Sequence, residues 1–306
     1  MKAVLIAFSF ALSLAAQAAS PAADGSPRFV VNLLDYVAAD YGGAVSGGKV
    51  TSPSEYQEQI EFTQSAIASL RTLPREPAQA KTLAQLEGRM ALLLKRIQAK
   101  ADATEIAALA QQIKQGVIQA TGLPVAPQRW PNLKQGARIF AQNCTTCHGP
   151  TGHGDGPAGK GLDPAPADFH DASMAEKTPF RAYNVIRVGV PGTGMVAWNT
   201  LSDQDAWDVA FYVMSMRYGR EPREIQGSSP FLLETLATTS DQELLKEFKG
   251  SDDERREQLV ALRLTSGSDG GGSSLALARS KLDEALVEYR AGKHDSAKQS
   301  SLAAYL

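Results

Sequence analysis

The chain has 306 residues, which is enough for two or three domains. Its hydrophobic fraction of 43% and charged fraction of 21% are those of an ordinary soluble protein. The formal net charge of -2 gives no reason to expect a nucleic-acid partner, and the presence of two cysteines excludes a framework of several disulfides.

Residues 1–19 have the pattern of an export signal. Lys2 supplies a positive start, residues 3–15 are apolar, and residues 16–18 have the small-x-small form of a signal-peptidase site. The alternative is an uncleaved membrane anchor, although the apolar run is short for a full span. We therefore expect cleavage near Ala18 and, for a bacterial protein, location in the periplasm.

Residues 20–124 contain four segments with helical periodicity and short connections, which predict an antiparallel helical bundle. Ser26 is the expected N-cap of the first helix, and the glycine pair at 42–43 is expected to end it. Ser52 and Glu55 have the spacing of a capping box for the second helix. The apolar stripe of the third segment consists of Leu83, Leu86, Met90, Leu93 and Ile97.

The apolar stripes of this bundle could line a cofactor site, but core packing is the simpler interpretation, because no histidine precedes residue 148. Glu55, Glu58 and Glu61 step by three along one helix and could gather a hard cation. A Glu-x-x-His pattern does not accompany them, so we interpret them as a solvated helix face.

Residues 128–220 form the next predicted unit, and they contain Cys144, Cys147 and His148 in a C-x-x-C-H pattern. This is the pattern of covalent c-type haem attachment. The two thiols would add across the haem vinyl groups, and a spacing of two residues places the sulfurs about one helical turn apart. His148 would then supply the first axial ligand of the iron.

Three other interpretations of the two cysteines compete with haem attachment. A redox-active C-x-x-C is expected near a βαβ pattern, but residues 132–143 indicate a helix and no strand–helix alternation follows. A structural zinc site needs four ligands, and the chain has no further cysteine. A disulfide across two residues would constrain almost nothing. The sequence therefore favours one haem c per chain.

Met195 is the best candidate for the second axial ligand. It lies in a loop well downstream of His148, just before a helix for which Ser202 is the expected N-cap. A thioether ligand raises the potential of a haem, which suits electron transfer. His170 is a weaker rival, and His153 lies too close to the attachment motif to reach the opposite face.

Residues 226–306 are predicted to be a C-terminal helical segment, which makes the whole chain all-α. Capping boxes begin at Ser240 and Ser251, and a Gly/Ser-rich linker lies near residues 265–274. An amphipathic helix follows this linker, and a last helix is expected to begin at Asp295.

Residues 133–218 resemble a class I cytochrome c. The resemblance rests on the attachment motif, Gly154-Asp-Gly-Pro157, Leu162 to Phe169, Gly192-Thr-Gly-Met195 and Leu201-Ser-Asp203 with Tyr212. It implies helices packed round a mostly buried haem, with Gly136 and Phe140 crossing Phe211 and Tyr212. It also implies that a proline carbonyl in the Pro164–Pro166 stretch accepts a hydrogen bond from His148 Nδ1. Val196 departs from the family, which commonly has proline after the methionine.

The flanking regions are similar to the periplasmic portion of fusion proteins that join a cytochrome c to an Ftr-type iron permease. The similar stretches run from Leu34 to Phe62 and from Leu282 to Leu306. The resemblance implies a role in iron transport with an inner-membrane iron permease as partner, besides redox partner proteins.

The sequence thus predicts a periplasmic electron carrier with a haem held by Cys144 and Cys147 and ligated by His148 and Met195. The alternative is a haem-based sensory or interaction module in which Met195 is labile. A peroxidase is not expected, because it would need an open iron face and usually a second haem motif.

Overall fold

The computed structural model describes residues 25–224, 230–267 and 274–305. The predicted export signal, residues 1–19, lies outside these ranges. The described residues are mostly helical, and their strands are two residues long. The all-α prediction is therefore confirmed.

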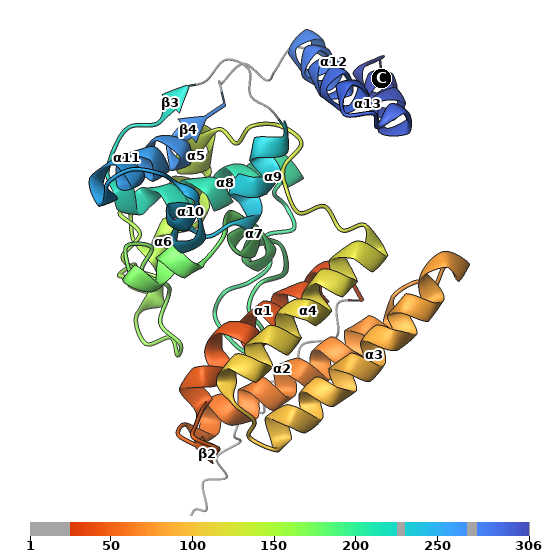
Figure 1. Ribbon diagram of the computed structural model, residues 1–306. Helices are drawn as coiled ribbons and strands as arrows, with labels where there is room; N and C mark the ends of the chain where they lie inside the picture. Colours follow the sequence, from red (N-terminus) through yellow and green to blue (C-terminus); the bar gives the residue numbers. More distant parts are fainter. Residues whose placement is uncertain (1–24, 225–229, 268–273, 306) are drawn as a thin grey trace, which may run out of the picture.

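Four helices form the N-terminal bundle, and they occupy the lower half of Figure 1. They are α1 (Pro27–Ala44), α2 (Pro53–Thr72), α3 (Pro77–Gln98) and α4 (Ala103–Thr121). Each buries one apolar stripe in a common core, as the periodicity predicts. The predicted stripe of α3, from Leu83 to Ile97, is fully buried or nearly so.

The glycine pair at 42–43 does not end α1, which continues to Ala44. Glycine in a last turn costs only about 1 kcal/mol relative to alanine, so packing along the rest of the helix can override it. The reversal comes from a hairpin of β1 (Val45–Ser46) and β2 (Lys49–Val50). Gly47 and Gly48 between these strands have φ of +56° and +74°, which suit a tight hairpin turn.

The predicted capping box at the start of α2 is not formed. Ser52 is the N-cap residue, but its side chain accepts no capping hydrogen bond. Its hydroxyl lies 3.5 Å from the hydroxyl of Ser54 instead, so a neighbouring serine competes with the helix backbone for it. The capping boxes predicted at Ser240 and Ser251 are both present.

The unit that follows the bundle is built on four helices and three 3₁₀ turns. The helices are α5 (Leu133–Asn143), α6 (Thr145–His148), α7 (Pro179–Val188) and α8 (Asp203–Ser215). The 3₁₀ turns are η1 (Pro157–Gly159), η2 (Ala172–Glu176) and η3 (Met216–Tyr218). Ser202 caps α8 by accepting a hydrogen bond from Asp205 N, as predicted.

Helices α5 and α8 cross at Gly136. A Cβ atom at this position would lie 2.2 Å from the carbonyl oxygen of Asp208 and 2.8 Å from Cβ of Tyr212, so only glycine allows the approach. Phe140 packs against Tyr212 with ring centroids 5.7 Å apart. Phe211 is also expected at this crossing, but on the helix it points about 100° away from the next residue, Tyr212. Its ring lies against that of Trp207 instead, with centroids 6.2 Å apart.

The first part of the C-terminal segment packs on this second unit. It contains α9 (Pro230–Thr238), α10 (Asp241–Glu247) and α11 (Asp252–Arg263). Arg263 donates a 2.6 Å hydrogen bond to the buried carboxylate of Asp241, which also pairs with Arg217 from η3. This charged cluster therefore joins α10 and α11 to the end of α8.

Two short strands close the same region. β3 (Arg223–Glu224) pairs in parallel with β4 (Thr265–Ser266), so the first residues of the predicted Gly/Ser linker are in a strand. The hydroxyl of Ser266 accepts a hydrogen bond from Leu133 N at 3.0 Å, at the start of α5. Residues 268–273 of the predicted linker lie outside the described residues.

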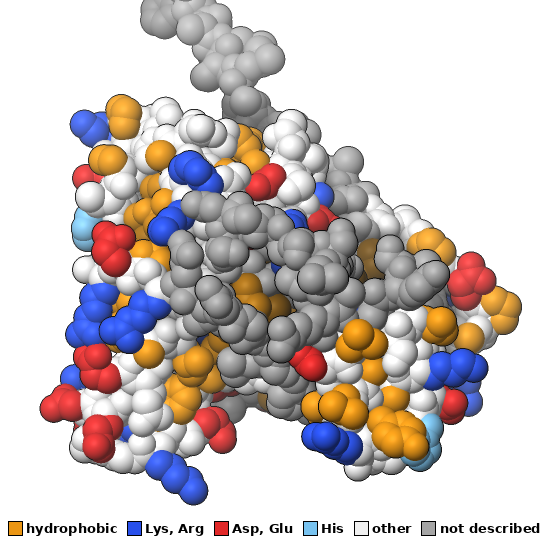
Figure 2. Space-filling view, turned by 90° about the horizontal axis from the view of Figure 1, so that it is seen from above, with side chains coloured by type: hydrophobic (Ala, Val, Ile, Leu, Met, Phe, Trp, Pro, Cys, Tyr) orange, Lys and Arg blue, Asp and Glu red, His pale blue; other side chains and the backbone are white. Residues whose placement is uncertain are grey.

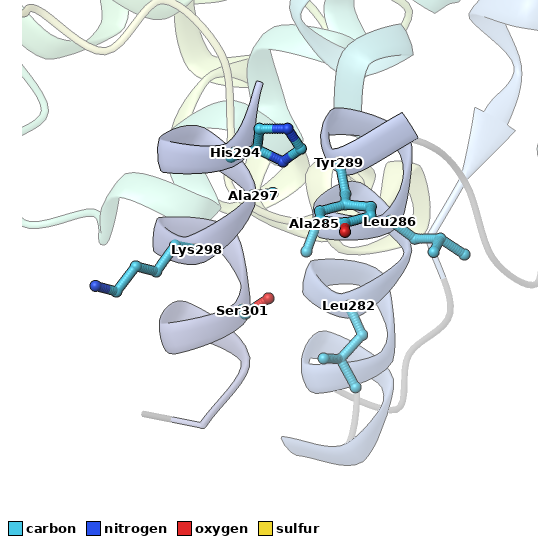
Figure 3. A pocket seen from close by; sticks show the side chains of 8 residues that line it. All are labelled: Leu282, Ala285, Leu286, Tyr289, His294, Ala297, Lys298 and Ser301. Atoms are coloured by element: carbon cyan, nitrogen blue, oxygen red, sulfur yellow. The ribbon is translucent and has the colours of Figure 1, made fainter. Parts of the chain in front are cut away.

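The last two helices, α12 (Ser274–Arg290) and α13 (His294–Tyr305), form a hairpin at the upper right of Figure 1. Glu288 accepts hydrogen bonds from the hydroxyls of Ser296 and Ser300 and so ties the helices together. A pocket of about 410 Å³ lies between them, and Tyr289 stacks edge-on against His294 at one end of it (Figure 3).

Acidic and basic side chains are interspersed on the described part of the face seen from above (Figure 2). This pattern differs from the single-signed basic surface that is typical of nucleic-acid binding. Within the described ranges, none of the helices combines the length and the apolar character required to cross a bilayer.

Candidate haem-attachment site

The attachment motif forms a single helical turn directly after α5. Cys144 caps the end of α5, and its carbonyl oxygen accepts hydrogen bonds from Cys147 N at 3.2 Å and His148 N at 2.9 Å. This turn is α6. Both thiols are free and half-buried. The two sulfur-bearing residues therefore lie one turn apart on the same short helix, which is the spacing that attachment to two vinyl groups requires.

The surroundings of Cys144 favour its neutral thiol. Burial, together with the neighbouring Cys147, raises the pKa of Cys144 to about 11. In redox-active C-x-x-C motifs the pKa of one thiol is lowered, whereas burial raises that of Cys144. The described residues around the motif are helical turns and loops, not the βαβ unit of a thiol oxidoreductase. These observations favour covalent attachment over a redox-active cysteine pair.

His148 is oriented by the loop that returns beneath it. Its Nδ1 lies 3.2 Å from the carbonyl oxygen of Ala167, and its ring stacks on Phe169 with centroids 4.8 Å apart. Burial lowers the pKa of the imidazole, and the hydrogen bond to Ala167 opposes part of this effect. With Nδ1 as donor, Nε2 carries the lone pair that an axial ligand needs.

The carbonyl acceptor is thus not in the Pro164–Pro166 stretch, where the family resemblance placed it. The carbonyl of Pro166 faces Gly154 instead, where an added Cβ atom would lie only 2.3 Å from it. Ala167, the next residue, presents its carbonyl to the ring. The sequence did not identify Ala167 as the acceptor or Phe169 as the stacking partner of His148, although both residues lie within the Leu162 to Phe169 motif.

The glycine-rich loop closes tightly over the back of the motif. Gly156 N donates to Cys147 O at 3.1 Å, and Gly154 N donates to His148 O at 2.8 Å. A Cβ atom at Gly156 would lie 2.5 Å from the carbonyl oxygen of Thr146. The glycines thus let the loop backbone satisfy the carbonyls of the α6 turn. The donor set, the half-buried thiols and this rigid loop together fit a covalently held haem.

Met195 lies in a loop that follows α7 and is closed by backbone hydrogen bonds. Its carbonyl oxygen accepts from Val190 N at 2.9 Å, and its own N–H donates to Thr193 Oγ1 at 3.1 Å. Trp198 N donates to Ile186 O at 2.8 Å, so both ends of the loop are held by α7. Met195 itself is half-buried.

The structure brings this loop against the loop that follows the attachment motif. A Cβ atom at Gly194 would lie 2.8 Å from Cδ1 of Leu162, so the two loops are in contact next to Met195. Val196, at the position where the family commonly has proline, is 62% exposed. The loop is therefore fixed by its own hydrogen bonds and by Leu162 rather than by a proline ring.

The other methionines of this unit have packing roles. Met174 and Met214 are almost fully buried in the apolar core. Met216 lies against Gly152, where an added Cβ atom would be 2.7 Å from its terminal methyl group. Unlike these three methionines, Met195 lies in a loop and is not part of the core packing, so it stays the candidate for the second ligand.

His170, the rival ligand, already uses a ring nitrogen. Its Nε2 lies 2.8 Å from the carbonyl oxygen of Thr151, and its ring stacks on that of His153 with centroids 4.2 Å apart. His153 Nδ1 in turn lies 3.3 Å from the carboxylate of Asp168. The pair belongs to the loops that return beneath the motif, which favours Met195 over His170 as the second ligand.

The bundle glutamates are not gathered into one cluster in the described part of the chain. Glu55 and Glu61 are exposed, and Glu58 is half-buried, with a pKa raised by burial and by the carboxylates around it. Among the residues that the structure describes, no group of three histidine, cysteine or acidic side chains is arranged to hold a metal ion. A solvated helix face remains the simplest interpretation.

Comparison with known protein families identifies both of the first two units. Residues 19–124 match the iron permease-associated four-helix bundle domain, and residues 133–217 match cytochrome c. The chain therefore contains an iron permease-associated bundle followed by a cytochrome c domain, as the resemblance to the fusion family predicts.

A curated relative is similar to part of the chain. A thiosulfate dehydrogenase from Stutzerimonas stutzeri (strain A1501) is 35% identical over 108 residues, and the match covers 33% of this chain. The match spans 33%, about a third, of that enzyme's own length. No solved structure matches the chain significantly.

Proposed function

We propose that this protein is an exported one-electron carrier that serves iron uptake together with a membrane permease. Cys144 and Cys147 would hold one haem c through thioethers, and His148 and Met195 would ligate its iron. The haem would supply a centre that gains or loses one electron without rearranging the protein around it.

The arrangement of His148 is the observation that carries the redox part of this proposal. Its Nδ1 is engaged by Ala167 O and its ring is held by stacking on Phe169. An imidazole fixed in this way keeps the same orientation in both oxidation states, which reduces the reorganisation that accompanies electron transfer. The hydrogen-bonded Met195 loop supports the same role, because it restrains the opposite ligand.

The iron role is supported by the way in which the two identified domains meet. Helix α1 of the iron permease-associated bundle packs directly on α7 of the cytochrome c domain. Arg28 donates a 2.8 Å hydrogen bond to Asn184 and lies 4.5 Å above the ring of Tyr183. Arg181 lies 5.0 Å above the ring of Tyr36 in the opposite direction.

The contact between the two domains matches the redox chemistry of iron. A ferrous ion gives up one electron when it becomes ferric, and a carrier of one electron is the matching acceptor. A domain associated with iron permeases and fixed to such a carrier suits the interconversion of iron beside a permease. The same two domains also support an extracytoplasmic location, which agrees with the predicted signal at residues 1–19.

A stopped-flow experiment tests the proposed function. The oxidised holoprotein is mixed with ferrous citrate, and the visible spectrum of the reduced cytochrome is followed. We expect reduction by one electron equivalent per chain. The absence of any reduction by ferrous iron, in a protein that ascorbate reduces fully, would contradict the iron role while leaving the carrier role intact.

Thiosulfate oxidation is a second candidate, which the similarity to the Stutzerimonas thiosulfate dehydrogenase favours. Two thiosulfate ions give up two electrons when they join as tetrathionate, so two haems of this kind would be reduced per pair. The same stopped-flow mixing with thiosulfate in place of ferrous citrate separates the two candidates. Reduction by thiosulfate alone would favour the enzyme over the iron-linked carrier.

A further inference from the structure

A single peptide group connects the N-terminal bundle with the loop that carries Met195. The carbonyl oxygen of Gly189 accepts a 3.2 Å hydrogen bond from Asn32 Nδ2, on α1. The N–H at the other end of this peptide group, that of Val190, donates a 2.9 Å hydrogen bond to Met195 O. Asn32 and Met195 therefore hold opposite ends of one rigid plane.

Gly189 is constrained from both sides. It ends α7 with φ of +71°, a conformation that favours glycine. A Cβ atom there would lie 2.7 Å from Met195 O and 2.9 Å from Ala197 N, so its backbone touches the Met195 loop directly. The peptide between Gly189 and Val190 consequently has little freedom to turn without moving residues 195–197.

The side chain of Asn32 donates its described hydrogen bond to this peptide group. It is fully buried at the interface of α1 and α7, and its Oδ1 has no hydrogen-bond partner among the described residues. A buried amide with an unsatisfied oxygen lowers the stability of the fold, so the presence of this residue needs an explanation. The hydrogen bond from its Nδ2 to the Gly189 carbonyl supplies that explanation.

We infer that Asn32 is a positioning residue for Met195, so that the bundle controls how firmly the distal ligand is held. This inference rests on the proposed role of Met195. Two hydrogen bonds on one peptide group polarise each other, so loss of the Asn32 bond weakens the bond to Met195 as well. Any event that shifts α1 would then change the distal ligand, and ligation would in turn bias α1.

The test compares Asn32→Leu with Arg28→Gln in the full-length holoprotein. Leucine has the same number and branching of side-chain heavy atoms as asparagine, and it removes the hydrogen bond to Gly189. Arg28 lies one turn earlier on the same helix and binds Asn184 and Tyr183, away from the Met195 loop. The control therefore disturbs the same interface without touching the bridging peptide.

Two measurements are made on each variant. Hydrogen exchange at the Val190 amide should become about five- to tenfold faster in Asn32→Leu, which corresponds to the loss of one ordinary hydrogen bond. Affinity of the ferric protein for added imidazole should rise by a similar factor, because Met195 is displaced more easily. Arg28→Gln should leave both values near those of the wild type.

Equal exchange at Val190 in Asn32→Leu and the wild type would overturn the inference, and so would equal acceleration in both variants. The outcome is separable from the proposed function. If Met195→Ala leaves the ligation of the iron unchanged, Met195 is not the ligand and the proposed site fails. The exchange rate at Val190 still decides whether Asn32 holds the loop.

Discussion

The Nδ1 atom of His148 lies 3.2 Å from the carbonyl oxygen of Ala167, in a loop that glycine backbones press against the attachment turn. This relationship fixes the tautomer, since Nδ1 must carry the proton that the carbonyl accepts. It also fixes the ring plane, because Phe169 stacks on the same imidazole. The donor atom left for a metal is therefore Nε2.

Replacement of either cysteine should weaken haem retention. In Cys144→Ala or Cys147→Ala at most one thioether can form, so we expect a sharp fall in haem content after purification. Acid–acetone extraction measures this directly, because it removes haem that is not covalently bound. Extraction of the haem from the wild-type protein would show that attachment is not covalent.

Loss of Met195 should open the distal side of the iron. Met195→Ala is expected to abolish the weak near-infrared band of the ferric methionine–iron bond and to permit carbon monoxide binding. His170→Ala is the matched control and should do neither, because His170 Nε2 faces Thr151 O. The reverse pattern would identify His170 as the ligand.

The crossing of α5 and α8 should not tolerate a side chain at Gly136. A methyl group there would lie 2.2 Å from Asp208 O, so Gly136→Ala should lower the free energy of unfolding by about 1–3 kcal/mol. Gly88 is the control, because it is exposed in α3 and a Cβ atom there meets nothing within 4 Å. Gly88→Ala should raise stability by about 0.5–1 kcal/mol in urea unfolding.

Asp208 should give the protein a distinct pH dependence. It is only 3% exposed, and burial raises its pKa from an ordinary 3.8 to about 6, although Asn132 N and Gln204 donate hydrogen bonds to it. The folded state thus keeps a proton that the unfolded state has lost. Stability from this group is complete below about pH 4 and disappears as the pH rises to about 6.

Urea unfolding between pH 4 and pH 7 tests this prediction by comparing the wild type with Asp208→Asn. Over the titration range the wild type should lose up to about 1.4 kcal/mol per pH unit relative to the variant. Asparagine can still accept both hydrogen bonds but has no charge to titrate. Parallel stability curves for the two proteins would show that the pKa of Asp208 is not raised.

The sequence was sufficient for the helices and for the attachment turn. Periodicity located the buried stripe of α3, and the C-x-x-C-H spacing located a turn in which Cys144 O accepts from both Cys147 N and His148 N. Local rules failed where neighbours compete for the same group. Ser54 interacts with the hydroxyl that would complete the capping box, and tertiary packing carries α1 through two glycines.

Contacts between distant segments could not be predicted from any local pattern. The hydrogen bond of Asn32 to Gly189 joins residues 157 positions apart, and Asn32 alone has no distinguishing motif. The family resemblance predicts an acceptor for His148 in the Pro164–Pro166 stretch, but the acceptor is Ala167 O. The close approach of Gly154 to Pro166 O decides which carbonyl of this loop faces the imidazole ring. The fold class could therefore be predicted from the sequence, whereas the residues that hold His148 and the Met195 loop in place could not.

The iron-linked role should be visible in cells. The motivation is the direct packing of an iron permease-associated bundle on a cytochrome c domain, together with the one-electron chemistry that iron interconversion needs. Deletion of the coding region should reduce iron uptake in cells grown with ferrous iron as the sole iron source. Expression of the wild-type protein should restore uptake, and Cys144→Ala should not, because the bundle alone cannot carry an electron. Unchanged uptake together with a loss of oxidase-linked respiration would refute the iron role and favour a general electron carrier.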